Sequence, residues 1–221
     1  MTVTDLATNG QKMTSTPEEA EYELRSAVSS YWTGGRLLIG MYTFFVAALA
    51  FAYFYLRSSN SGDLWRPAHI TAPTAVGAAV FAFTAAASIV VVYGNKRLQA
   101  GLVTDWQVAA WTAVGSLLGA IGLQIYEYTR LPFFPGSSGY ASTFVGWTVM
   151  NLMMLVGSLY WIETLVATSI RLRHALPAGA TIANSQTPRV QKFRANLESC
   201  TSFFQFAAAV GVLFWALFYL I

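Results

Sequence analysis

Five long apolar runs constrain the fold of this chain more than any other feature. They cover about residues 36–57, 72–94, 106–128, 143–170 and 199–221. Each is long enough for a helix that crosses the hydrocarbon core of a bilayer, which takes roughly 20 residues. Charged residues make up only 10% of the chain, whereas a soluble domain carries about 25%, so little polar sequence remains to cover five buried helices. The sequence therefore predicts an all-α integral membrane protein, a bundle of five transmembrane helices.

The basic residues between these runs predict how the bundle is oriented. The second and fourth connections hold more arginine and lysine than the first and third, and such enrichment marks cytoplasmic loops. We therefore expect a cytoplasmic N-terminus and a C-terminus outside. The same distribution accounts for the net charge of +3, so we expect no nucleic-acid partner. The residues counted are Lys96, Arg97, Arg171, Arg173, Arg189, Lys192 and Arg194 on one side, and Arg57, Arg66 and Arg130 on the other.

Residues 1–33 are polar and acidic, unlike the rest of the chain. Thr16 is a typical N-cap and Pro17 a typical first helical residue, and Glu18 and Glu19 follow in the first turn, where the helix dipole favours them. We predict a cytoplasmic N-terminal segment over 1–33 with a short surface helix, followed by a five-helix membrane domain over 34–221.

The chain is poor in metal and redox ligands. Cys200 is the only cysteine, so no intramolecular disulfide can form. The two histidines, His69 and His174, fall in separate loops, whereas a haem or copper site needs ligands that converge. We expect no cofactor bound by this chain.

Asp105 and Glu163 are ionisable residues in or next to the apolar runs. Asp105 directly precedes Trp106, and we interpret it as an N-cap at the cytoplasmic interface. Glu163 lies two turns before Arg171, where a charge in lipid is costly and is a functional candidate by default. It either pairs with a polar group on a neighbouring helix or subunit, or lies in the proton or ion path of a small transporter.

Glu127 sits at the end of an apolar run, between Tyr126 and Tyr128 and three residues before Arg130. That spacing brings side chains together on a helix, and flanking tyrosines are typical of the belt at the lipid headgroups. A proton relay and a metal ligand are alternatives, but we interpret this carboxylate as a structural anchor near the outer surface.

Three segments in a fixed order carry a resemblance to a known family. They are "FAYFYLRSSNSGDLWRP", "LQIYEYTRL" and "YASTFVGWTVMNLMMLVG", and the chain ends in "LFWALFYLI". This order resembles subunit III of the haem-copper cytochrome c oxidases, in the short five-helix form found in many bacteria. The matching positions are Tyr53, Arg57, Trp65, Gln124, Glu127, Tyr128, Tyr140, Ser142, Phe144, Thr148 and Gly157.

The chain also departs from the pattern of that family. Met41 and Tyr42 replace a Ser-Glu pair in the first helix. Asn151 and Met154 stand where the family has two histidines. Gln205 and Ala208 replace a histidine and an aspartate in the last helix. Asparagine and glutamine can still hydrogen-bond between helices, but neither titrates near neutral pH as histidine does.

The resemblance implies a non-catalytic subunit of a respiratory oxidase in a bacterial plasma membrane. Its partners would be the catalytic subunit I, subunit II and membrane phospholipids, with haem and copper bound by the partner subunits. Alternatives are an accessory subunit of a nitric oxide reductase or other membrane oxidoreductase, or a small membrane transporter. The residues expected at the lipid interface are Tyr53, Arg57, Trp65 and Arg130, and the intramembrane polar residues expected to be structural are Gln124, Glu127, Tyr128, Asn151, Glu163 and Gln205.

Overall fold

A computed structural model describes residues 16–60, 64–67, 70–177 and 180–220. Five helices in this part of the chain are long and apolar enough to cross a membrane, which confirms the predicted all-α fold. Each predicted run falls on one of these helices, while the orientation stays a prediction. The helices are α1 (Pro17–Ser59), α2 (Thr74–Gln99), α3 (Val103–Thr129), α4 (Gly139–Ala175) and α5 (Pro188–Trp215), and α5 continues into a π-helical turn, η3 (Ala216–Leu220).

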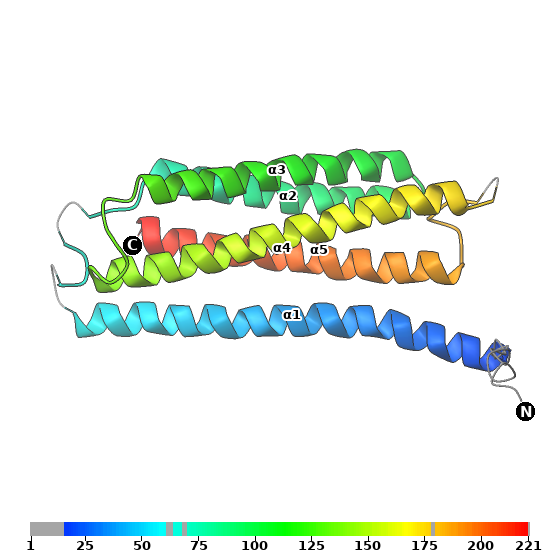
Figure 1. The fold of residues 1–221 in the computed structure, drawn as a ribbon, viewed down its shortest axis with the longest axis horizontal. Helices are drawn as coiled ribbons and strands as arrows, with labels where there is room; N and C mark the ends of the chain where they lie inside the picture. The colour runs from blue at the N-terminus through cyan, green and yellow to red at the C-terminus, as the bar shows by residue number, and fades with distance from the viewer. Residues whose placement is uncertain (1–15, 61–63, 68–69, 178–179, 221) are drawn as a thin grey trace, which may run out of the picture.

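The start of α1 is fixed by a capping box. The Thr16 hydroxyl accepts from the Glu19 backbone N–H at 3.3 Å, and the Glu19 carboxylate accepts from the Thr16 N–H at 2.7 Å. The predicted cap at Thr16 is thereby confirmed. From Pro17 the helix continues to Ser59, and Figure 1 shows it as one long helix that bends toward its N-terminal end. The predicted domain boundary at residue 33 therefore falls inside a helix.

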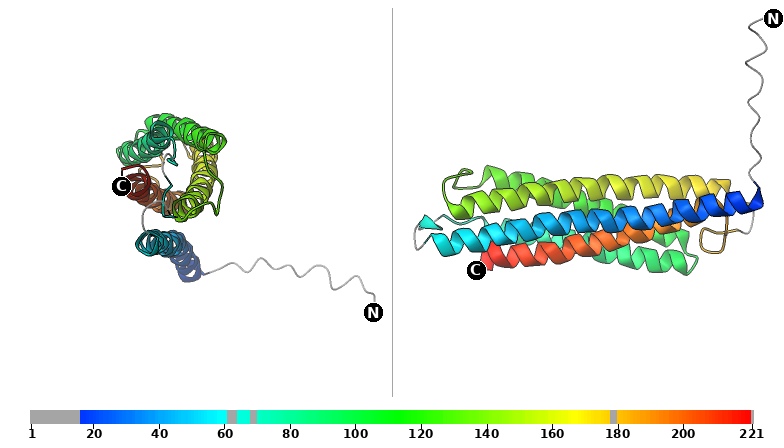
Figure 2. Two further views of the ribbon diagram at one scale, coloured as in Figure 1. Left: turned by 90° about the vertical axis from the view of Figure 1, so that its left-hand side faces the viewer. Right: turned by 90° about the horizontal axis from the view of Figure 1, so that it is seen from below.

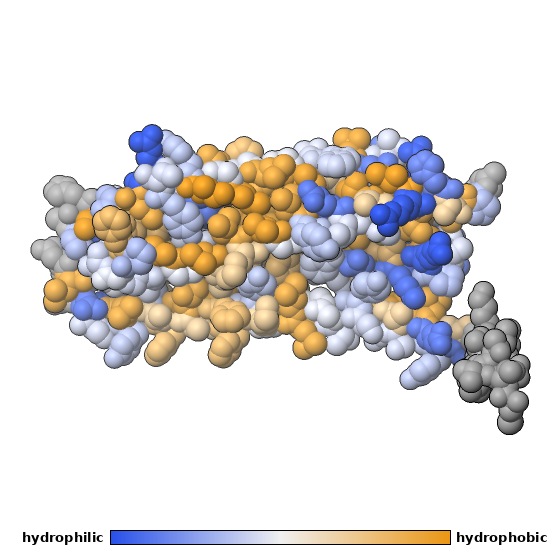
Figure 3. All heavy atoms as spheres, viewed as in Figure 1, coloured by the Kyte–Doolittle hydropathy of each residue, from blue (hydrophilic) through white to orange (hydrophobic). Residues whose placement is uncertain are grey.

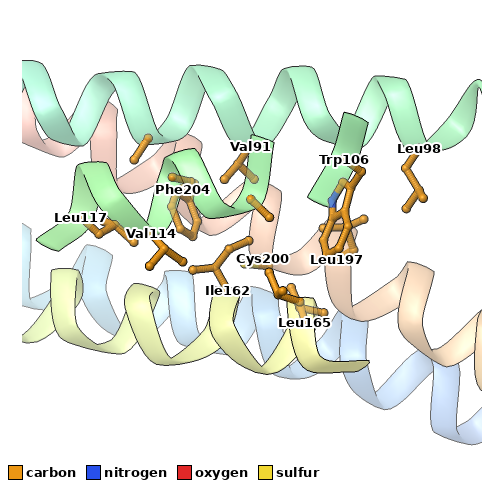
Figure 4. Close-up of a cluster of buried hydrophobic side chains, with 14 of the residues drawn as sticks. Val91, Leu98, Trp106, Val114, Leu117, Ile162, Leu165, Leu197, Cys200 and Phe204 are labelled. Carbon is orange, nitrogen blue, oxygen red and sulfur yellow. The ribbon is translucent and has the colours of Figure 1, made fainter. Parts of the chain in front are cut away.

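Helices α2 to α5 form a four-helix group, and α1 lies outside it along α5 and α4 (Figures 1 and 2). One buried apolar cluster fills the group between α2, α3, α4 and α5, and Figure 4 shows Trp106, Ile162 and Phe204 among its side chains. A second, aromatic-rich cluster joins α1, α4 and α5 at the end where α1 finishes. Figure 3 shows hydrophobic residues over most of one face, with hydrophilic ones gathered mainly toward the end where α1 begins.

The connection between α2 and α3 overturns one prediction. Helix α3 begins at Val103, with Leu102 at the N-cap position and no side-chain cap. Asp105 therefore lies within the first turn, and the predicted N-cap role is wrong. Its carboxylate instead accepts two hydrogen bonds from Arg97 on α2, at 2.6 and 2.9 Å, because the short connection brings these helix ends face to face.

Candidate functional site

Glu127 lies at the centre of a buried polar network. Its side chain is 1% exposed, and it accepts hydrogen bonds from the Gln124 amide at 2.6 Å and the Tyr219 hydroxyl at 2.5 Å. Gln124 in turn accepts from the Asn151 amide at 3.0 Å. Since α3 supplies Gln124 and Glu127, α4 supplies Asn151 and η3 supplies Tyr219, the network ties three segments together.

Gly77, in the first turn of α2, gives Tyr219 its access to the carboxylate. A Cβ atom on Gly77 would lie 2.2 Å from Cζ of the Tyr219 ring. The ring therefore rests directly against the backbone of α2. A side chain at this position would displace the Tyr219 hydroxyl from Glu127. The network therefore also depends on α2, which supplies Gly77.

A small cavity adjoins the network. It offers about 30 Å³ to the centres of water molecules, which is room for one or two waters. Glu127, Thr84 and Thr148 line it together with Trp215, whose indole N–H is buried and has no hydrogen-bond partner among the described residues. A lining that combines oxygen acceptors with an unpaired N–H suits water, which both donates and accepts, better than a metal cation, which takes oxygen ligands.

Arg130 and Glu127 form no ion pair in the described part of the chain, although they are three residues apart. Arg130 is exposed, and its guanidinium donates to the Tyr126 hydroxyl at 3.0 Å and lies over the Tyr126 ring. Helix α3 ends at Thr129. Arg130 lies just beyond this end and is exposed, whereas the Glu127 side chain is buried in the bundle. Tyr128, the other predicted structural residue here, is partly buried on α3.

Tyr53 and Tyr140 hold the last turn of the described chain. The Tyr53 hydroxyl donates to the carbonyl of Leu217 at 2.8 Å, and the Tyr140 hydroxyl donates to that of Phe218 at 3.0 Å. The final carbonyls of a helix lack partners within it. Two side chains from α1 and α4 supply those partners, so the end of η3 is secured inside the bundle.

Arg57 and Trp65 lie where this tyrosine cluster meets the surface. Arg57 donates to the Tyr53 hydroxyl at 3.1 Å. Trp65 is 9% exposed and packs edge-on against Tyr53 and Tyr140, with ring centroids 5.1 and 6.2 Å apart. Little of Trp65 or Tyr53 reaches the surface, and lipid contact by Tyr53, Arg57 and Trp65 stays a prediction, as it does for Arg130.

The two remaining polar residues of the prediction, Glu163 and Gln205, face outward. Both are exposed on the bundle surface, Glu163 on α4 and Gln205 on α5. They are therefore separate from the network around Glu127. Asn151, by contrast, joins helices α3 and α4 through its hydrogen bond.

A basic pocket lies at the opposite end of the bundle. Arg171, Arg189 and Lys192 line it with Tyr31 and Phe193, and its volume is about 310 Å³. The ion pairs within the described ranges are Arg25–Glu21 and Arg97–Asp105, so none of these three cations is neutralised in that part of the chain. Helices α1, α4 and α5 converge here.

Sequence reasoning missed several of these residues. Tyr219 and Trp215 stand in a terminal aromatic stretch that looks like an interfacial belt, and no motif marks either as reaching Glu127. Arg171, Arg189 and Lys192 contributed only to the orientation argument. Their position at the ends of two apolar runs was the signal for a shared pocket.

Within the described ranges, no three His, Cys, Asp or Glu side chains come close enough to share a metal ion. The haem and copper expected in partner subunits stay predictions. A scan against protein-family models finds no family that matches this chain, and a search of curated proteins finds no match either.

Proposed function

We propose that this chain is a non-catalytic subunit of a bacterial respiratory haem-copper oxidase, of the subunit III type. One observation carries the proposal. Residues that bear the resemblance are widely separated in sequence but belong to one buried region, where Tyr53, Trp65 and Tyr140 pack together and Glu127 lies close by in the network with Gln124. When motifs far apart in sequence pack into one buried region, their order along the chain is expected to be kept among related proteins. The packing of these residues therefore supports the resemblance.

In this role the chain stabilises the catalytic subunit I, contacts subunit II and retains phospholipids in the plasma membrane. Electron transfer and oxygen reduction belong to the partner chains that hold haem and copper. The chain itself contributes helical surface, an internal polar network and lipid contacts.

The basic pocket supports the lipid part of the proposal. Arginine binds phosphate oxygens through paired N–H groups, and basic pockets between helices on the cytoplasmic side bind anionic headgroups. Arg171, Arg189 and Lys192 supply the charge, while Leu172 and Phe193 add apolar surface for the start of the acyl chains. We expect phosphatidylglycerol or another anionic phospholipid to occupy it.

A lipid-dependent stability measurement tests this pocket. Phosphatidylglycerol should raise the Tm of the purified protein more than phosphatidylcholine does, because only the former is anionic at neutral pH. The double variant Arg171→Gln, Lys192→Gln should lose most of that difference. Lys96→Gln, an exposed cation on α2 outside the pocket, is the matched control, and an equal loss there would contradict a specific site.

A pull-down from the native membrane in mild detergent tests the function itself. We expect a haem-bearing subunit I to co-elute with the tagged chain and to give an a-type or b-type reduced-minus-oxidised spectrum. A nitric oxide reductase catalytic subunit in the eluate would favour the alternative function, an accessory subunit of a nitric oxide reductase, which the replaced histidines leave open. A haem-free eluate, under conditions that keep other respiratory complexes intact, would overturn the proposal.

The transporter alternative requires Glu163 in an internal path. Glu163 lies on the outer surface of α4, so no observation favours that function.

A further inference from the structure

Helix α4 presents a regular stripe of exposed side chains along its outer face. Successive members are separated by alternating steps of four and three residues, the 3.5-residue period of helices that pack along a shared seam. Met153 and Tyr160 are 56% and 70% exposed. The stripe consists of Val149, Met153, Val156, Tyr160, Glu163, Ala167 and Ile170, all exposed.

Because it contains Glu163, this stripe is unsuited to a surface that contacts only lipid. It lies eight residues before Arg171, which at 1.5 Å per residue is about 12 Å deeper along the helix. Neither ion pair of the described ranges involves Glu163. A charged group at such depth is costly and normally pairs with a partner.

A second copy of this chain is a poor occupant of the stripe. Parallel copies in one membrane would meet about a twofold axis, so each residue of the seam would face its own counterpart or a near neighbour. The two Glu163 carboxylates would then approach each other in a medium of low dielectric constant, where like charges repel strongly. The occupant that fits is a different helix that brings a hydrogen-bond donor or a cation.

We propose that the outer face of α4 docks a transmembrane helix of another chain, and that Glu163 pairs with an arginine, lysine or histidine on that helix. The inference rests on the proposed function as an accessory subunit and specifies the surface through which it assembles. Val149, Met153, Val156 and Ile170 provide the apolar seam, and Glu163 sets the register of the partner helix.

Photo-crosslinking in the native membrane tests the surface. The photoreactive amino acid p-benzoylphenylalanine replaces Tyr160 in the stripe or, as the matched control, Ile89, which is 68% exposed on α2. Helix α2 lies across the four-helix group from α4 (Figure 2). We expect an adduct at position 160 whose cross-linked peptide is an apolar segment with a basic residue. We expect no adduct with that peptide at position 89.

Two substitutions at Glu163 test the pairing. Glu163→Leu should lower the yield of the adduct at position 160 at least tenfold, and Glu163→Gln should lower it less, because the amide oxygen still accepts a hydrogen bond. An unchanged Tm would show that each variant folds, as expected for an exposed site. Equal yields in the wild type and Glu163→Leu would overturn the inference, as would adducts with lipid alone or with a second copy.

The outcomes separate this inference from the proposed function. A cross-linked partner that carries haem, or that belongs to the haem-bearing complex, supports both. A basic transmembrane partner from a haem-free complex supports the docking surface and overturns the oxidase assignment. Co-elution of a haem-bearing subunit without any adduct at position 160 overturns the docking surface and leaves the oxidase assignment in place.

Discussion

At the scale of single residues, the network around Glu127 pairs its polar groups with one another inside an apolar bundle. Glu127 shares its carboxylate between Gln124 and Tyr219, and Asn151 completes the chain of hydrogen bonds. Leaving a buried donor without an acceptor costs about 1–3 kcal/mol. The stability of this end of the bundle should therefore depend on the carboxylate.

Substituting Glu127 tests that dependence. Glu127→Leu removes the acceptor for both donors, and we expect a loss of about 1–3 kcal/mol, with Tm falling by roughly 2–4 °C per kcal/mol for a chain of this size. Glu127→Gln keeps one acceptor oxygen but turns an NH₂ group toward the other donor. Its Tm should therefore lie between those of the wild type and Glu127→Leu. Thermal unfolding in detergent gives the order, and a Glu127→Leu variant that melts like the wild type would contradict a stabilising network.

Two tyrosines two residues apart on α1, one buried and one exposed, give a matched comparison. Tyr53→Phe removes the hydroxyl that donates to the Leu217 carbonyl, and we expect a loss of about 1 kcal/mol. Tyr55 is 58% exposed, so Tyr55→Phe should leave Tm unchanged. Equal effects in the two variants would show that the bond to Leu217 does not support the fold.

At the scale of helices, α2 and α3 form the most extensive pair in the bundle. Gly94 permits a close approach of the two helices, because a Cβ atom there would lie 2.8 Å from Cβ of Ala109. The distance leaves no room for a methyl group unless the two helices move apart. The pair is therefore sensitive to any added side chain at this position.

Gly94→Ala should cost about 1–3 kcal/mol through overpacking. Gly122→Ala on α3 is the control, since a Cβ atom at Gly122 meets nothing within 4 Å and alanine favours helix. We expect Tm to fall for the first variant and to hold or rise for the second. A pair of variants that both keep the wild-type Tm would mean that the helices separate without cost.

The sequence predicts the helices well because the apolar runs are long, but it locates their ends poorly. Helix α5 begins at Pro188, eleven residues before the predicted run, because helices continue past the hydrocarbon into polar sequence. Glu127 and Asn151 were identifiable as polar residues within apolar runs. The outward direction of Glu163 and Gln205 was not, because α4 and α5 are apolar on most sides and periodicity does not separate a lipid face from a buried one.

At the scale of the whole molecule, the single cysteine allows a direct test of orientation. Cys200 is 0% exposed in the core, so we expect the wild-type chain to resist a membrane-impermeant maleimide. Ser58→Cys, at the exposed end of α1, should react in intact cells. Gln186→Cys, exposed before α5, should react only after permeabilisation. The reverse pattern would place the N-terminus outside.

The unbroken course of α1 has a mechanical consequence. A helix of 43 residues is about 65 Å long at 1.5 Å per residue, roughly twice the 30 Å hydrocarbon thickness. The part of α1 before its apolar segment continues into that segment as uninterrupted helix, so the two parts are coupled more directly than they would be through a loop. A force or torque applied near Glu18 would reach Tyr53 and the aromatic cluster at the other end of the helix as a movement of the helix itself, whereas a flexible linker would absorb it.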